Sequence, residues 1–145
     1  EMSVQQLSVF VENKRGGLAE VTHALAQNRI NILALSIADT TDYGVLRMIV
    51  DRPEEAAEIL KMQNAAVTLT DVLAVKMPNY PGGLDGAVQA LSAENISIEY
   101  MYAFVCPLPE EACMVFRVEE RDRAGKVLED AGYTQLVTSD LYERK

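Results

Sequence analysis

The stretch PNYPGGLDG, residues 78–86, concentrates the residue types of this chain that are best suited to holding a small polar ligand. A pair of glycines lets backbone N–H groups approach a ligand closely, and the N-terminus of a following helix favours a carboxylate. Asn79 adds both a donor and an acceptor, which suits a ligand carrying an ammonium and a carboxylate together. The competing interpretation is a tight turn from strand to helix that holds no ligand.

Residues that could catalyse a reaction do not form a recognisable set in the sequence. His23 is the only histidine and is expected on the solvent side of a helix, and no nucleophile is paired with a base. The acidic pairs at 54–55 and 119–120 are interpreted as charges at helix starts. We therefore expect no catalytic residues, and a binding protein rather than an enzyme.

Cys106 and Cys113 flank the segment PLPEEA, which places them near the two ends of a hairpin. Two thiols and one histidine cannot make a four-ligand structural zinc site. Neither a metal nor a cofactor is therefore expected. The thiols are either free and partly buried or joined in a labile disulfide across the hairpin.

The charge and hydropathy of the chain argue against two classes of partner, nucleic acids and membranes. With 145 residues and a net charge of −9, it has no basic face on which nucleic acid could bind. No apolar run approaches the roughly 20 residues that a membrane span needs, and no signal peptide is recognised. We expect a cytoplasmic protein that binds neither nucleic acid nor membrane.

The candidate loop belongs to an internal repeat. Residues 16–35 align with residues 82–101, and the match continues upstream, where LSVFVEN falls on LAVKMPN. Downstream, residues 46–60 resemble residues 114–128 after a short insertion. The chain is therefore interpreted as a tandem duplication.

Each repeat is predicted to contain a strand, a helix, two strands, a second helix and a final strand. In the first repeat, alternation and turn residues place strands at 5–12, 30–38, 45–50 and 66–69, with the segment DTTDYG as a hairpin turn. Leu18, Val21 and Leu25 predict the buried stripe of the first helix, which Asn28 is expected to close in a left-handed conformation. Pro53 marks the start of the second helix.

This order predicts an α+β fold made of two ferredoxin-like βαββαβ units, with domains at residues 3–70 and 71–142. In each unit the strand order is expected to be fourth, first, third, second, with both helices on one face. The second strand is then an exposed edge. We expect the two second strands to pair into one eight-stranded antiparallel sheet, which would form two pseudo-equivalent clefts between the units.

A duplicated βαββαβ unit whose first helix opens with N-x-P-G-x-L, as in NYPGGL at 79–84, resembles the ACT domain. The resemblance covers essentially the whole chain, with NKRGGL at 13–18 as the less faithful copy. It implies a regulatory module that binds an amino acid. The partners it implies are that effector and a metabolic enzyme regulated in trans. Exposed sheet faces and outer edge strands separately favour a homodimer.

The resemblance to serine-regulated phosphoglycerate dehydrogenases implies which residues bind the ligand. There, effector is held by the loop asparagine of one domain and an asparagine just before the second strand of its neighbour. One expected cleft pairs the loop residues Asn79, Tyr80, Pro81, Gly82, Gly83 and Leu84 with Asn31 and Ile32; the other pairs Asn13, Lys14, Arg15, Gly16, Gly17 and Leu18 with Ser97 and Ile98. Leu84 is expected to plug its helix into the core.

The sequence also departs from that pattern. A histidine two residues before the loop asparagine is replaced by Val11 and Met77, which puts serine specificity in question, and Arg15 stands where Pro81 stands in the second copy. Two functions therefore stay open. One is a small-molecule sensor with an amino acid effector; the other is a structural or protein-interaction module that has kept the fold without the ligand.

Overall fold

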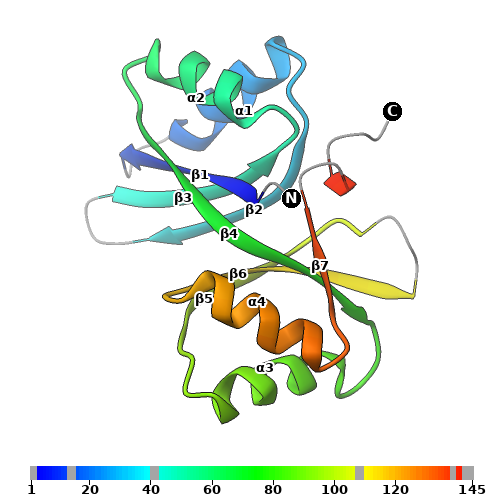
Figure 1. The fold of residues 1–145 in the computed structure, drawn as a ribbon. Coiled ribbons are helices and arrows are strands. Elements are labelled where there is room, and N and C mark those ends of the chain that lie inside the picture. Colours follow the sequence, from blue (N-terminus) through cyan, green and yellow to red (C-terminus); the bar gives the residue numbers. More distant parts are fainter. Residues whose placement is uncertain (1–2, 13–15, 40–42, 107–109, 138–139, 142–145) are drawn as a thin grey trace. The chain divides into compact units, whose positions relative to one another are not determined.

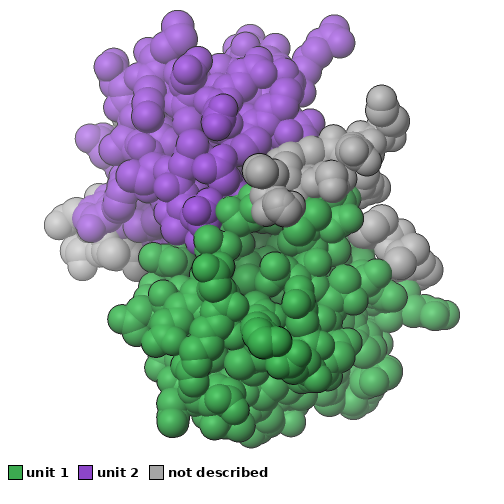
Figure 2. Space-filling model, in the orientation of Figure 1, with its two compact units in different colours: residues 1–4, 72–145 green, residues 5–71 purple. Residues whose placement is uncertain are grey.

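The computed structural model describes residues 3–12, 16–39, 43–106, 110–137 and 140–141. The chain divides into two compact units (Figure 2). Residues 5–71 form the N-terminal unit, and residues 72–145 together with residues 1–4 form the C-terminal unit. Of the predicted hairpin turn DTTDYG, residues 40–42 lie outside the described residues.

Both units have the predicted α+β order (Figure 1). The N-terminal unit contains β1 (Val4–Glu12), α1 (Gly17–Gln27), β2 (Ile32–Asp39), β3 (Tyr43–Val50), α2 (Pro53–Lys61) and the first part of β4 (Ala66–Pro78). The C-terminal unit contains the rest of β4, α3 (Gly83–Ala93), β5 (Ile98–Phe104), β6 (Glu111–Val118), α4 (Arg121–Asp130) and β7 (Thr134–Leu136).

The strand order within each unit is the predicted one. β4, β1, β3 and β2 follow one another in the N-terminal unit, and β7, β4, β6 and β5 in the C-terminal unit. In each unit both helices pack on the same side of the strands (Figure 1). The ferredoxin-like arrangement is therefore confirmed for both repeats.

The expected eight-stranded sheet with paired second strands is wrong. The described part of the chain has seven strands, and β2 and β5 lie at the two ends of the hydrogen-bonded order. The physical reason is the short junction between the repeats. Because only Thr70, Asp71 and Val72 separate them and the backbone continues without a turn, the last strand of one repeat and the first strand of the next are one strand, β4.

Each unit has its own apolar core. Leu7, Val21 and Leu25 are buried among the core residues of the N-terminal unit, and Val75 and Leu91 among those of the C-terminal unit. These are the faces that the alternation of β1 and β4 and the helical spacing of α1 and α3 require.

The two leucines expected to anchor the first helix of each repeat do not belong to these cores. Leu18 and Leu84 are each 41% exposed, so the prediction for them is wrong. Helical side chains tilt toward the N-terminus of their helix, so a residue in the first turn lies over the preceding loop rather than over the sheet. The glycine before each leucine is buried in its place.

The end of α1 also differs in detail from the prediction. Asn28 has a φ of −101°, and the left-handed residue is Arg29, with a φ of 60°. The side-chain amide of Asn28 instead donates a hydrogen bond to the Ala24 carbonyl oxygen at 2.8 Å. Asn95 takes the equivalent left-handed position after α3, with a φ of 58°.

Candidate functional site

The glycine pair of the C-terminal unit forms a tight turn onto α3. Gly82 has a φ of 93°, a conformation that glycine adopts without strain. Gly83 is buried, and a Cβ atom at this position would collide with the Pro78 carbonyl oxygen. The Gly83 N–H donates to the Tyr80 carbonyl oxygen at 2.9 Å, which closes the turn. Each glycine is therefore required by the backbone.

The turn leaves donors at the start of α3. The first helical hydrogen bond runs from Gly86 N–H to the Gly82 carbonyl oxygen, at 2.9 Å, and no side chain caps the helix. The N–H groups of Leu84 and Asp85 have no partner among the described residues. These groups and the positive end of the helix favour an anion.

Contacts that were not predicted hold this loop. The Asn79 N–H donates to the Glu110 carbonyl oxygen at 3.0 Å, and the Tyr133 hydroxyl donates to the Gly83 carbonyl oxygen at 3.1 Å. A Cβ at Gly86 would collide with the same hydroxyl oxygen. Gly86, the third glycine of the opening stretch, was the only signal in the sequence for Tyr133.

A cavity of about 510 Å³ adjoins the loop in the C-terminal unit. It is lined by Lys76, Met77, Pro78, Asn79, Tyr80, Glu110, Glu111, Gly132 and Thr134, and we call it the β4 pocket. Two predicted site residues, Asn79 and Tyr80, line it. Pro81, Gly82 and Leu84 follow these residues in the sequence and are exposed, but they do not line the pocket.

The glycine loop of the N-terminal unit repeats the same turn. Gly16 has a φ of 89°, and a Cβ at the buried Gly17 would lie 3.2 Å from the Glu12 carbonyl oxygen. Asn13, Lys14 and Arg15 lie outside the described residues. The sequence repeat therefore corresponds to one backbone conformation at both glycine pairs.

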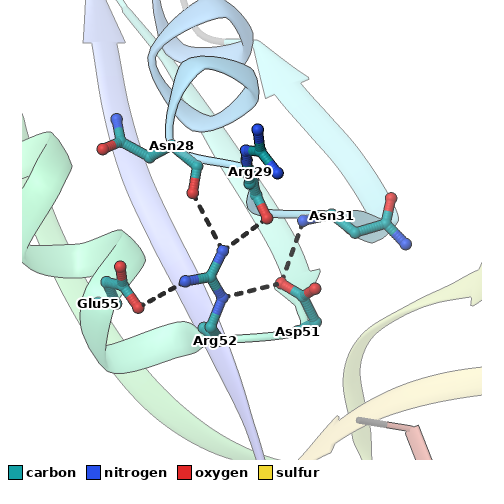
Figure 3. A network of polar contacts seen from close by, with 6 residues as sticks. All are labelled: Asn28, Arg29, Asn31, Asp51, Arg52 and Glu55. Carbon is teal, nitrogen blue, oxygen red and sulfur yellow. Dashed lines mark hydrogen bonds and ion pairs between the residues drawn. The ribbon is translucent and has the colours of Figure 1, made fainter. Parts of the chain in front are cut away.

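Asn31 is fixed through its backbone (Figure 3). Its N–H donates to Oδ1 of Asp51 at 3.0 Å, and the Asp51 N–H donates to the Asn31 carbonyl oxygen at 3.1 Å. The side-chain amide of Asn31 is exposed and extends away from this network. Ile32, the next predicted site residue, begins β2.

Arg52 holds the end of α1 beside Asn31. Its Nη2 donates to the carbonyl oxygens of Asn28 and Arg29, at 3.0 and 2.6 Å, and its Nη1 contacts Glu55 at 2.8 Å (Figure 3). In the C-terminal unit, Arg123 donates to the Glu94 carbonyl oxygen at 2.7 Å.

Ser97, the repeat counterpart of Asn31, is exposed before β5, which begins at Ile98. Within the described residues, no hydrogen bond joins its backbone to the start of α4, unlike the pair that Asp51 makes with Asn31. The expected pairings across units, Asn79 with Asn31 and Asn13 with Ser97, stay predictions.

The two cysteines are free thiols. Cys113 is 2% exposed, and burial, with a hydrogen bond to the Cys106 side chain, raises the pKa of its thiol from 9.0 to about 12. Cys113 therefore stays protonated at neutral pH and is a poor nucleophile.

Other reactive groups are dispersed over the described surface. His23 is exposed on α1, as expected. No group of three histidine, cysteine or acidic side chains in the described ranges could hold a metal ion. No helix in the same ranges is both long and apolar enough to cross a membrane.

Comparison with known proteins places these features in a family. A family model described as an ACT domain pair matches residues 2–143. The crystal structure of a Bacteroides thetaiotaomicron protein is similar, with 43% sequence identity and a TM-score of 0.90, over 99% of this chain and 98% of that chain. A comparison with curated proteins gives no match.

Two more distant structures share the fold. The regulatory subunit of aspartate kinase from Thermus thermophilus, in a ligand-free form, has 16% identity and a TM-score of 0.68, over 91% of this chain and 95% of that chain. The corresponding subunit from Thermus flavus has 16% identity and a TM-score of 0.62, over 90% of this chain and 94% of that chain.

Proposed function

The chain belongs to the ACT domain pair family, and from this membership we propose that it binds a small amino acid and passes the occupancy of its site to a partner. ACT domains are regulatory modules, so the proposed activity is binding and not catalysis. The partner is a metabolic enzyme regulated in trans, or the protein's own homodimer.

The observation that carries this proposal is the turn at Gly82. It opens α3 with two N–H groups, at Leu84 and Asp85, that have no partner among the described residues. The loop before the turn lines the β4 pocket. The positive end of this helix favours an anionic group near it, and an amino acid carries a carboxylate. Asn79 lies on the same loop, in the lining of that pocket.

We propose that a second copy of the chain completes each site. β2 and β5 are the outermost strands in the hydrogen-bonded order, and outer strands offer backbone donors and acceptors to another chain. In this homodimer Asn31 and Ile32 of one copy face the Asn79 loop of the other. Ser97 and Ile98 likewise face the loop that contains Asn13 and Gly16.

A screen of the common amino acids by thermal shift and calorimetry, with the intact chain, tests the proposal. Binding to the folded state raises its stability, by about 2.7 kcal/mol at a ligand concentration of roughly 100 times Kd. Asn79→Ala should weaken binding more than Asn13→Ala, since only the loop of Asn79 keeps its proline. The reverse order would reject this assignment of loops.

A second function is favoured by one observation. Met77 takes the position of the effector histidine and is 3% exposed within the core of the C-terminal unit, and Val11 packs against the other core. Both side chains contribute to apolar cores, and neither offers the hydrogen-bonding nitrogen atoms of a histidine. If no amino acid stabilises the chain at millimolar concentration, a structural or protein-interaction module of the same fold becomes the better description.

A further inference from the structure

The β4 pocket is built on paired backbone. Lys76 is the register partner of Thr134 on β7, and Pro78 is the register partner of Glu111 on β6. The Asn79 N–H is bonded to the Glu110 carbonyl oxygen at 3.0 Å. Because three strands and one loop bond fix the walls, the pocket is formed before any ligand arrives.

Its charged groups are close but loosely engaged. Nζ of Lys76 lies 3.5 Å from Oε1 of Glu111. This is longer than a charge-assisted hydrogen bond, which is usually about 2.7–2.9 Å. That carboxylate oxygen is buried and has no hydrogen-bond partner in the part of the chain that the structure describes. A buried oxygen without a hydrogen bond is destabilising, so a ligand donor that reaches this carboxylate would be favoured.

Further polar groups on the pocket wall are unused. No hydrogen bond is made by the side chains of Asn79, Tyr80 or Thr134, or by the Glu110 carboxylate, to any described residue. The pocket therefore brings together one ammonium, two carboxylates, one amide and two hydroxyl groups from separate segments of the C-terminal unit.

We propose that the β4 pocket holds the charged head group of a free α-amino acid. The ligand carboxylate binds the Lys76 ammonium and the Asn79 amide, and the ligand ammonium binds the carboxylates of Glu110 and Glu111. The Thr134 hydroxyl donates to the same ligand carboxylate. This assignment rests on the proposed function and adds binding residues outside the glycine loop.

The pocket also sets the class of amino acid. Two glutamates and one lysine leave an excess of negative charge, so acidic side chains are repelled. A volume of about 510 Å³ lies within the roughly 300–1,000 Å³ range of small-molecule sites, and so does not restrict the ligand to glycine or serine. Tyr80, 64% exposed, offers an aromatic surface to the ligand side chain. The preferred ligands are neutral or basic amino acids.

The test uses the intact chain with L-serine, L-leucine, L-lysine and L-aspartate as probes in titration calorimetry. At least one of the first three should bind, with L-aspartate weakest. For the tightest probe, its methyl ester and its α-hydroxy acid analogue should each bind at least about tenfold more weakly, because each removes one charged group. Tightest binding by L-aspartate, or equal binding by the hydroxy acid, would overturn the charge assignment.

Variants then locate the site. Lys76→Met should weaken binding by about tenfold and Thr134→Val by a smaller factor, whereas Lys76→Arg should keep most of the affinity because it keeps the charge. Lys126→Met is the matched control, since Lys126 lies on α4 in an exposed pair with Asp130. Thermal melting of each variant shows whether it is folded.

The outcomes separate this inference from the proposed function. If none of the common amino acids binds the wild-type chain, both are rejected. If one binds, and Asn31→Ala weakens it while Lys76→Met and Thr134→Val do not, the regulatory function stands and the β4 pocket is rejected. If the pocket variants weaken binding and Lys126→Met does not, the assignment is supported.

Discussion

The neighbouring glycines Gly82 and Gly83 are needed for different physical reasons. Gly82 has a positive φ, but a Cβ there would meet open space. Gly83 packs against the carbonyl oxygen of Pro78, so there is no room for a side chain. The first glycine sets the direction of the turn, and the second allows α3 to begin against the end of β4.

Alanine at the two positions should therefore have unequal effects on stability. Gly82→Ala should lower the free energy of unfolding by about 1 kcal/mol, the cost of a left-handed residue with a side chain. Gly83→Ala should lower it by about 3 kcal/mol, because backbone atoms must move. Urea denaturation measures both. Gly17→Ala is the matched control, with a contact of 3.2 Å, and should fall between them.

The Cys113 thiol predicts how stability depends on alkaline pH. Its pKa is about 12 in the folded protein and 9.0 without the surrounding structure, so the unfolded chain loses this proton first. The contribution is therefore complete below pH 9 and is lost as the pH rises toward 12. Between about pH 8 and about pH 11, Cys113→Ala should lose less Tm than the wild type. An equal loss in both proteins would contradict this.

At the residue scale, a position could be predicted where its conformation suits essentially one residue type. The glycine pairs were identified because few other residues make such turns. Leu18 and Leu84 were placed wrongly because helical spacing does not reveal that the first turn lies over a loop. Tyr133 was missed, because Gly86 shows only that space is needed there and the tyrosine reaches Gly83 from 50 residues away in the sequence.

At the scale of elements, an arginine bonds the C-terminal end of the first helix in each repeat, but the two arginines occupy different sequence positions. Arg52 stands just before α2, whereas Arg123 lies within the first turn of α4. Both guanidinium groups bond carbonyl oxygens at the end of the preceding helix of their unit. These carbonyl groups have no partner within their own helix, and a cation there also favours the helix dipole.

Arg52→Gln should lower the free energy of unfolding by about 1 kcal/mol, because it removes two charged hydrogen bonds that are partly exposed to water. Urea denaturation gives this value. Arg121→Gln is the control, since Arg121 has an exposed partner, Asp122, at 3.7 Å, and its change should be near zero. A change for Arg52→Gln no larger than the control would show that this closure contributes nothing.

The order of helices and strands could be read from the sequence because alternation, helical spacing and turn residues agree within each repeat. The fusion of the last strand of the first repeat with the first strand of the second, as β4, could not be read from the sequence. A short β-prone segment such as TDV is compatible with a turn and with a continuous strand, and the choice between them depends on pairing partners elsewhere in the chain.

At the scale of the whole molecule, duplication leaves outer strands that no described strand covers. β2 carries Leu35 and Ile37, which are 40% and 48% exposed. Exposed apolar residues on an outer strand favour pairing with another chain, and proteins that avoid such pairing place charges there. The assembly expected from the sequence therefore shifts from pairing within one chain to pairing between copies.

Sedimentation equilibrium should show dimers of the wild-type chain, and Ile37→Lys should raise the dimer dissociation constant at least about tenfold by placing a charge on the outer strand. Met62→Lys is the matched control, because Met62 is an apolar residue that is 84% exposed after α2. A monomeric wild type at all concentrations, or equal effects of both variants, would reject the dimer.

The continuous β4 strand limits how the two repeats could be exchanged or separated as gene segments. The boundary between the units, after Asp71, falls inside that strand, and Val4 belongs to the C-terminal unit although Gln5 belongs to the other. A fragment ending at residue 71 would cut a strand through its middle and leave Val4, 1% exposed in the intact chain, without its packing. Recombination could therefore replace the pair more readily than either half.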